Sequence, residues 1–247
     1  MDWRNIDFYQ AFAAHYARLY DAVDADEVVR QWLMLLDEEL HLVPDAEARA
    51  VTRPRLLDLG CGPGWHLVAW HRAGFEVVGV DASEAMLDLA ATTLRSESVN
   101  AKATLADVRA LPALGEFDLV VAHLNLIHLL PPEDLRPFFA SAAAQLRASG
   151  VIVVDWKPQR DLAVIKEHLG EWLRTLHEDQ GLLYAEWASA HGALTEYIWP
   201  HEPGDVERSA RDAGLRLLGH RRWVDAGRVL TIWAAPCTTE SVPRASK

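Results

Sequence analysis

The segment LLDLGCGPGWH, which begins at Leu56, constrains the fold more than any other part of the chain. Its apolar start ends in Asp58, and three glycines follow at alternate positions, Gly60, Gly62 and Gly64, before a helical segment. This order predicts a strand, a tight turn and the start of a helix. Glycine lets the backbone take positive φ and approach a ligand closely, and the N–H groups at a helix start favour an anionic group. The segment therefore predicts a ligand-binding turn.

A second apolar segment, FEVVGVD, ends in Asp81. In nucleotide-binding α/β folds, an acidic residue about twenty residues after the glycine turn binds the ribose hydroxyls. This half of the chain therefore predicts a nucleoside site. A dinucleotide site is not indicated, because its turn reads G-x-G-x-x-G and Trp65 stands where the last glycine would fall.

Four segments in order resemble the class I S-adenosylmethionine-dependent methyltransferase family. LLDLGCGPG and VVGVDAS resemble its first two motifs, ATLADVRALP places Asp107 at the end of a third strand, and GEFDLVVAHLNLIHLL resembles its fourth motif. The resemblance covers about residues 50–160. It implies an α/β fold with a Rossmann-like, seven-stranded, mostly parallel sheet, helices on both faces and an antiparallel last strand. It also implies S-adenosyl-L-methionine as the cofactor.

The resemblance further implies which residues bind that cofactor. Asp81 is expected to bind the ribose, Asp107 the adenine amino group, and Asp58 the methionine amino group, either directly or by fixing the turn. The expected cofactor-binding residues are Tyr16, Tyr20, Asp58, Gly60, Cys61, Gly62, Asp81, Ala82, Met86, Asp107, Val108 and His123. For Tyr16 and Tyr20 two interpretations stay open: in similar enzymes an N-terminal aromatic closes over the methionine end, but aromatic residues at helical spacing are also typical of core.

Strands and helices alternate through the middle of the chain, which predicts a parallel sheet with right-handed crossovers. We expect strands at 55–59, 75–80, 103–107, 117–122 and 150–155, then a helix at 205–214 and a closing hairpin of strands at 215–223 and 228–236. Before the sheet, two amphipathic helices are expected. The first carries an aromatic stripe of Phe8, Phe12, Tyr16 and Tyr20 at a spacing of four, and the second covers 26–40.

These elements predict one methyltransferase domain over residues 1–237. It consists of N-terminal helices (1–50), a core (51–155), a cap insert (156–204) and a C-terminal part of the core (205–237), and a polar tail (238–247) is expected to be disordered. The insert is expected to hold a helix near 161–177 and a stretch rich in Trp and His.

Three histidines are candidate catalytic residues: His123, His128 and His191. A base is needed only if the methyl acceptor must lose a proton, and the ordinary pKa of histidine suits that task. His123 follows the fourth strand directly, so it should lie at the carboxyl edge of the sheet, where the ligands of such folds bind. Its alternative role is to shape the cofactor pocket, and His191, His201 and Asp155 are the reserve bases.

The insert supplies the candidate substrate-binding residues, which are Trp156, Trp187, Tyr197, Trp199 and His201. They predict either an aromatic lid over a flat or cationic acceptor or a hydrophobic cap that only holds itself together. A metal is not expected, because no Cys pair or H-x-x-x-H stands at ligand spacing.

Composition limits the partners. The formal net charge is −12 and no basic stripe is visible, which argues against nucleic acid as a partner. No apolar run is long enough to span a bilayer, no N-terminal signal is visible, and Cys61 and Cys237 make no disulfide framework. We therefore expect a cytoplasmic protein without a membrane partner. A homodimer stays open as an alternative to a monomer.

The expected function is methyl transfer to an oxygen or nitrogen atom of a small molecule. The alternative is a fold that binds the cofactor but catalyses a non-methylating reaction such as a cyclisation.

Overall fold

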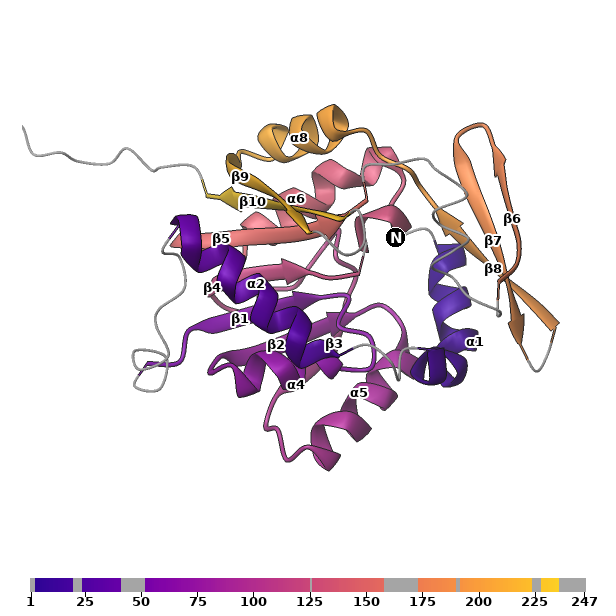
Figure 1. Cartoon of the computed structure of the whole chain (residues 1–247), viewed down its shortest axis with the longest axis horizontal. Helices are drawn as coiled ribbons and strands as arrows, with labels where there is room; N and C mark the ends of the chain where they lie inside the picture. Colours follow the sequence, from indigo (N-terminus) through magenta and orange to yellow (C-terminus); the bar gives the residue numbers. More distant parts are fainter. Residues whose placement is uncertain are drawn as a thin grey trace, which may run out of the picture.

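The computed structural model describes residues 3–19, 24–40, 52–124, 126–157, 173–189, 192–223 and 228–235. Its centre is a seven-stranded sheet in the order β3-β2-β1-β4-β5-β10-β9 (Figure 1). Strands β1 to β5 run parallel to one another, and β10 is antiparallel to both β5 and β9. This confirms the predicted fold class. The strands are β1 Arg55–Leu59, β2 Glu76–Asp81, β3 Lys102–Leu105, β4 Phe117–Ala122, β5 Leu146–Trp156, β9 Arg216–Trp223 and β10 Arg228–Ala234.

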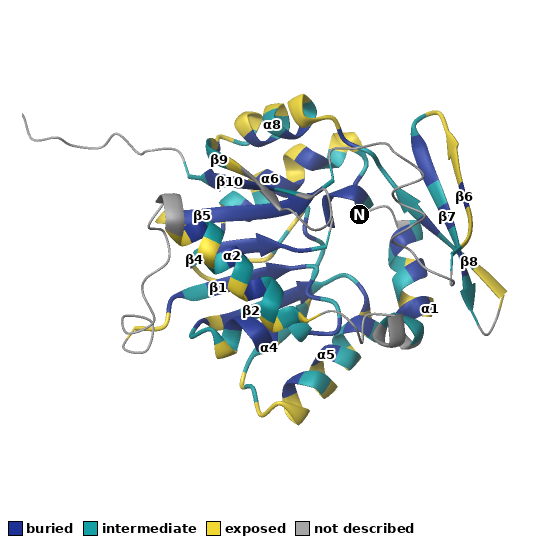
Figure 2. Ribbon diagram, viewed as in Figure 1, coloured by how far each residue is buried: buried dark blue, intermediate teal, exposed yellow. Residues whose placement is uncertain are grey.

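Helices cover both faces of this sheet, so its central strands are buried on both sides (Figure 2). Strands covered on both faces read as continuous apolar runs rather than alternating ones, which is how β1 and β4 read. One face carries α6 (Leu135–Ala143) and α8 (Pro203–Asp212), with Phe138, Phe139 and Val206 in its core. The other carries α2 (Ala25–Leu40) and α4 (Trp65–Arg72), with Trp32 and Trp70 packed edge to face. Helix α5 (Glu84–Ser96) follows β2.

The observed strands lie close to the predicted ones. The predictions of 55–59 and 117–122 match β1 and β4, and the other predicted strands of the parallel sheet overlap observed ones. The end of the predicted helix at 161–177 is wrong, because residues 173–177 belong to strand β6 (Leu173–Asp179), while 158–172 lie outside the described residues. The missed signal is the turn that follows: Gln180 and Gly181 take φ of +51° and +82°, the conformation of a two-residue hairpin turn.

The insert forms a separate antiparallel sheet of β6, β7 (Leu182–Ser189) and β8 (Gly192–Ile198). Helix α1 (Trp3–Leu19) lies between this small sheet and the core (Figure 1). Phe8 and Phe12, the first half of the aromatic stripe, pack with Leu183, Ala185 and Trp187 of the insert. The small sheet thus holds α1 over the carboxyl edge of the large sheet.

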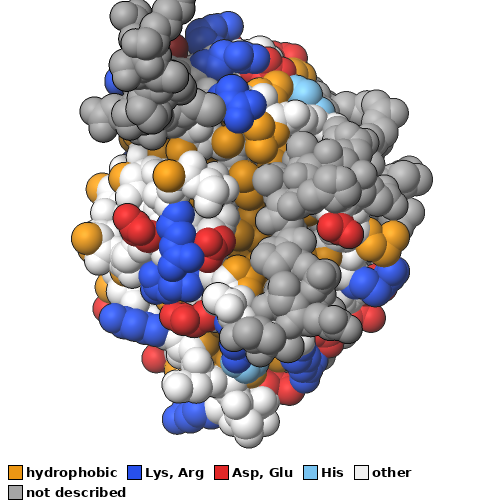
Figure 3. Space-filling view, turned by 90° about the vertical axis from the view of Figure 1, so that its left-hand side faces the viewer, with side chains coloured by type: hydrophobic (Ala, Val, Ile, Leu, Met, Phe, Trp, Pro, Cys, Tyr) orange, Lys and Arg blue, Asp and Glu red, His pale blue; other side chains and the backbone are white. Residues whose placement is uncertain are grey.

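The opposite side of the molecule, viewed in Figure 3, carries basic and acidic side chains intermixed. At the amino ends of the central strands, Arg55 pairs with Glu76 and Arg147 pairs with Asp118. None of the helices among the described residues is long and apolar enough to cross a membrane. No group of three or more metal-ligating side chains gathers in this part of the chain.

Candidate active site

A cavity with about 700 Å³ of empty space, its mouth included, lies between α1 and the carboxyl ends of β1, β2 and β4. Ligands of open α/β sheets bind at this edge, outside the carboxyl ends of the strands. Its lining consists of Ile6, Tyr9, Tyr16, Asp58, Gly60, Cys61, Gly62, Pro63, Trp65, His66, Asp81, Ser83, Met86, His123, Leu124, Leu126 and Leu129.

The glycine turn forms one wall of this cavity. Gly60, Gly62 and Gly64 all take positive φ, at +68°, +51° and +84°, which is costly for other residues. A Cβ on Gly60 would lie 2.8 Å from the Leu126 side chain, whereas a Cβ on Gly62 would meet nothing within 4 Å. The turn therefore needs its glycines for conformation, and Gly62 presents open backbone to the cavity.

Asp81 is fixed by the backbone around it. Its Oδ2 accepts from the Gly62 N–H and its Oδ1 from the Ser83 N–H, each at 2.9 Å. Burial raises the pKa of Asp81 in spite of these bonds. Because a carboxylate can accept about four hydrogen bonds, the oriented group can still receive hydroxyl donors from a ligand.

Asp58, at the end of β1, is the most unusual group in the cavity. It is 1% exposed, and neither carboxylate oxygen has a hydrogen-bond partner in the described part of the chain. Burial, and then the charge of Asp81, raise its pKa well above the ordinary value. A buried carboxylate without a donor is costly. The cavity therefore presents an acceptor that suits an ammonium group.

His123 lines the cavity as expected, but its surroundings do not favour a base. Trp70 Nε1 donates to His123 Nε2 at 2.9 Å, and the ring stacks on His66 at 4.3 Å and lies 4.1 Å from the ring of Trp32. An indole N–H only donates, so Nε2 must hold its lone pair and the neutral ring carries hydrogen on Nδ1. To accept a proton, His123 would have to break the bond to Trp70 and place a charge among buried aromatic rings.

His128 bonds backbone groups through both of its ring nitrogens. Its Nε2 accepts from the Lys157 N–H at 3.2 Å and its Nδ1 donates to the Trp199 carbonyl at 2.7 Å. Burial lowers its pKa to about 4. His201 stacks on the same ring at 5.5 Å and bonds the Ile127 carbonyl at 2.9 Å. The catalytic role of His128 and the substrate role of His201 stay predictions, and both rings bond backbone groups of the core and of the insert.

The aromatic residues predicted to bind substrate do not line the cavity. Trp156 is 1% exposed in the core beside β5, and Trp187 is buried against Phe12 of α1. Tyr197 bonds Asn5 of α1 through its backbone, and the Trp199 backbone bonds His128. Of the two interpretations of the insert, the structure favours the hydrophobic cap, because the Trp187 side chain packs against α1 and the backbones of Tyr197 and Trp199 bond Asn5 and His128.

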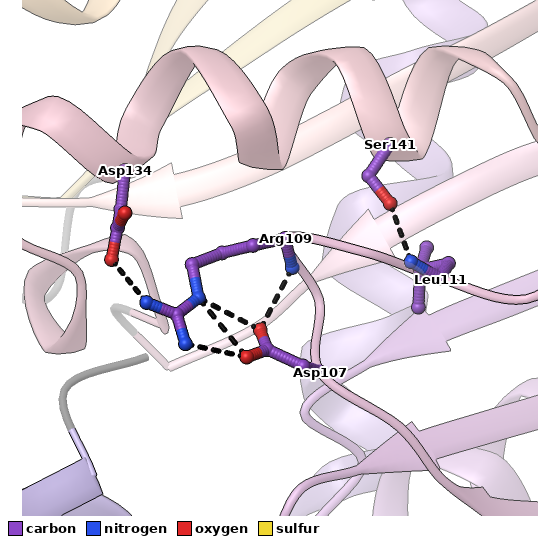
Figure 4. A network of polar contacts seen from close by, with 5 residues as sticks. All are labelled: Asp107, Arg109, Leu111, Asp134 and Ser141. Atoms are coloured by element: carbon purple, nitrogen blue, oxygen red, sulfur yellow. Dashed lines mark hydrogen bonds and ion pairs between the residues drawn. The ribbon is translucent and has the colours of Figure 1, made fainter.

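Asp107 follows β3 and is held in an ion-pair network (Figure 4). Arg109 Nε donates to both of its oxygens at 3.0 Å, and Arg109 Nη1 donates to Asp134 at 2.6 Å. Burial raises the pKa of Asp107, but the bonds from Arg109 outweigh this effect and leave the pKa below its ordinary value. Asp107 and the buried Val108 do not belong to the lining of the cavity.

The other predicted site residues divide into two groups. Tyr16, Cys61 and Met86 line the cavity, and Ala82 lies between Asp81 and Ser83, which line it too. Tyr16 also stacks on Trp65, with ring centroids 6.0 Å apart. Tyr20 and His191 lie outside the described residues.

The comparisons with known proteins agree with this geometry. A family model described as a methyltransferase domain matches residues 56–150. The trans-aconitate 2-methyltransferase of Delftia acidovorans is 38% identical over 131 residues, which cover 51% of this chain and 44% of that enzyme. A crystal structure of a Pyrococcus horikoshii protein (PH0226) has a TM-score of 0.71 at 23% identity and shares the fold over 90% of this chain and 98% of its own. Residues 56–150, the part of the chain that the family model covers, are similar to the methyltransferase domain of class I S-adenosylmethionine-dependent enzymes.

Proteins similar to this chain include one with a different reaction in its name. The carboxy-S-adenosyl-L-methionine synthase of Campylobacter hominis is 23% identical over 196 residues, which cover 78% of this chain and 83% of the synthase. The chain spans about half the length of several other curated relatives that it matches, among them the Delftia enzyme. The reaction and the acceptor of this protein are therefore argued from its own residues.

Several residues of the cavity were missed by sequence reasoning. Ile6 and Tyr9 of α1 face it from above, and His66 and Leu129 line it from the core. The helical period of α1 could have indicated Tyr9, which stands next to the aromatic stripe. No spacing rule points to His66, whose place depends on the stacking with His123.

Proposed function

We propose that this protein transfers the methyl group of S-adenosyl-L-methionine to an oxygen or nitrogen atom of a small-molecule acceptor. The observation that carries the proposal is the Asp58 carboxylate, which is buried without a donor at the wall of a cavity beside the backbone-fixed Asp81. These two carboxylates suit a ligand with an ammonium group at one end and ribose hydroxyls nearby. The glycine turn between them allows close approach of such a ligand.

The residues of the chain are expected to act mainly by position. When bound, the cofactor supplies a methyl group that is already activated by its sulfonium. Asp58 would hold the amino group of the cofactor and Asp81 its ribose, while Gly62 presents backbone to the ligand. Holding donor and acceptor in attack geometry can supply roughly 7–11 kcal/mol of the barrier. Helix α1, held by the insert, covers the cavity and would exclude water from it.

A small acceptor is supported by the way α1 closes the cavity and by the name of the Delftia relative. A second candidate function is a non-methylating reaction on the cofactor itself. The observation that favours it is the length over which the chain aligns with the carboxy-S-adenosyl-L-methionine synthase.

A double-label experiment separates the two functions. The protein is incubated with a metabolite extract and S-adenosylmethionine labelled in the methyl group or in the adenosyl group, and products are followed by mass spectrometry. Methyl transfer predicts a small product that carries only the methyl label, together with S-adenosylhomocysteine. A new product that carries both labels would favour the second function. If calorimetry detects no binding of S-adenosylmethionine or S-adenosylhomocysteine, both candidate functions are refuted.

A further inference from the structure

A buried carboxylate lies directly behind the α1 wall of the cavity. Tyr9, which lines the cavity, donates its hydroxyl to Glu196 Oε1 at 2.7 Å. Trp187 Nε1 donates to Glu196 Oε2 at 3.1 Å. Glu196 is 8% exposed on β8, so one phenol separates a carboxylate from the ligand cavity.

Among the described residues, the Glu196 carboxylate has no positively charged side chain as a hydrogen-bond or ion-pair partner. Both of its donors are neutral, and no Lys or Arg forms an ion pair with it in the described ranges. Burial raises its pKa, and the bonds from Tyr9 and Trp187 compensate only in part. A buried charge without an ion partner is expensive. A Gln in its place could accept from Trp187 through its single carbonyl oxygen, but its amide NH2 would have to donate to the Tyr9 oxygen and so reverse that bond. Only a carboxylate accepts from both donors at this position.

Two histidines of this region, His123 and His128, have ring nitrogens that are bonded elsewhere. Trp70 bonds His123 Nε2, and the ring nitrogens of His128 bond the backbone of Lys157 and of Trp199. A phenol oxygen, in contrast, can accept one hydrogen bond while it donates another. Tyr9 can therefore receive a proton from the cavity side while it passes its own proton to Glu196.

We propose that Tyr9 and Glu196 form the pair that takes the proton of the methyl acceptor, with Tyr9 as the catalytic residue and Glu196 as the final proton holder. This inference rests on the proposed methyl transfer. In the step, the acceptor oxygen or nitrogen bonds to the methyl carbon, and the carbon–sulfur bond breaks with its electron pair going to sulfur. The acceptor proton passes to the Tyr9 oxygen, and the Tyr9 proton passes to the Glu196 carboxylate.

The pair also specifies the class of acceptor. A carboxylate acceptor has no proton to lose, so a proton-accepting pair would be idle with it. Among the described residues, the lining of the cavity includes Asp58 and Asp81 but no Lys or Arg that would attract an anion. The acceptor of this pocket is therefore an alcohol, a phenol or an amine, and not a molecule that is methylated on a carboxylate.

The test compares isosteric variants. Glu196→Gln keeps the shape of the side chain and the bond from Trp187, but its amide donates to Tyr9 and cannot take a proton. Tyr9→Phe removes the relay. Matched controls are Glu186→Gln on β7, whose carboxylate bonds Thr175, and Tyr184→Phe, which stacks on His177. For each protein, methyl transfer from labelled S-adenosylmethionine into the metabolite extract is measured at saturating cofactor, and calorimetry gives the Kd for S-adenosylhomocysteine.

Transfer is expected to fall by about 10²-fold or more in both test variants, as for loss of a proton acceptor, while the Kd stays within twofold and both controls transfer normally. Normal transfer by Glu196→Gln would overturn the proposal, because the amide cannot take the proton from Tyr9. A parallel loss of S-adenosylhomocysteine binding would also overturn it and assign the pair to the shape of the pocket. A labelled product that is a methyl ester would exclude the acceptor class. A wild-type protein that binds the nucleoside but transfers no label would instead remove the proposed function, and this inference with it.

Discussion

Replacing Asp58 by Asn should change stability and cofactor binding in opposite directions. In the free protein the carboxylate is 1% exposed and lacks a donor, and its pKa is raised by burial and by Asp81. A carboxyl whose pKa is higher in the folded than in the unfolded state costs stability as pH rises from the unfolded pKa through the folded one. The amide removes this cost, which we place at about 1–3 kcal/mol for an unsatisfied buried group. The midpoint of thermal unfolding should then rise by roughly 2–4 °C per kcal/mol.

The same substitution should weaken the binding of the cofactor. A charge-assisted hydrogen bond contributes about 1.5–3 kcal/mol, so loss of the bond to the methionine ammonium should raise the Kd roughly 10- to 150-fold. Calorimetry measures the Kd, and thermal unfolding between pH 4 and pH 8 measures the stability, with a gain over wild type that grows with pH. Asp118→Asn is the control, because Asp118 lies at the amino end of β4 and bonds Arg55 and Arg147. An Asp58→Asn protein that is less stable at pH 7, or that binds S-adenosylmethionine as wild type does, would refute the reasoning.

Three further substitutions test other parts of the site. Asp81→Ala should raise the cofactor Kd at least tenfold in calorimetry, since each ribose bond contributes about 1–3 kcal/mol; unchanged affinity with an intact circular-dichroism spectrum would make the side chain structural only. Arg109→Gln should raise the pKa of Asp107, because the bonds from Arg109 lower it. If Asp107 binds the adenine, the same substitution should weaken cofactor binding several-fold. An unchanged Kd would show that the ion pair does not belong to the cofactor site. His123→Phe should reduce methyl transfer less than tenfold between pH 6 and pH 9, because Trp70 occupies Nε2. A loss of about 10²–10⁴ there would restore His123 as the proton acceptor.

The cofactor half of the site could be predicted because its geometry is local. Asp58, the glycine turn and Asp81 belong to one strand–turn–helix–strand unit, in which each residue is placed by the element next to it. The strands β1 and β4 could also be predicted, since continuous apolar runs are typical of strands that are buried on both faces. The sequence also placed His123 correctly at the carboxyl end of β4. Its hydrogen-bonding state depends on Trp70, which comes from another element.

The acceptor half could not be predicted, because its contacts join distant parts of the chain. Tyr9 and Glu196 are 187 positions apart and meet only because α1 lies on the small sheet. The Trp- and His-rich stretch was expected to face an acceptor, but strand alternation decides which side chains point inward. Trp187 and Glu196 point toward α1, whereas Tyr184 stacks on His177. A helix expected near 161–177 hid this alternation.

The insert therefore affects the cavity indirectly, through its contacts with α1. None of its described residues lines the cavity, yet it fixes the helix that does, through the packing of Trp187, the Asn5 bonds to the Tyr197 backbone and the carboxylate of Glu196. Such an arrangement separates two tasks. In the proposed function, the glycine turn and the ends of β1 and β2 would form a constant cofactor site, while substitutions on one face of α1 would reshape the acceptor site without disturbing it. We expect changes at Ile6 and Tyr9 to alter which acceptors are methylated before they alter cofactor affinity.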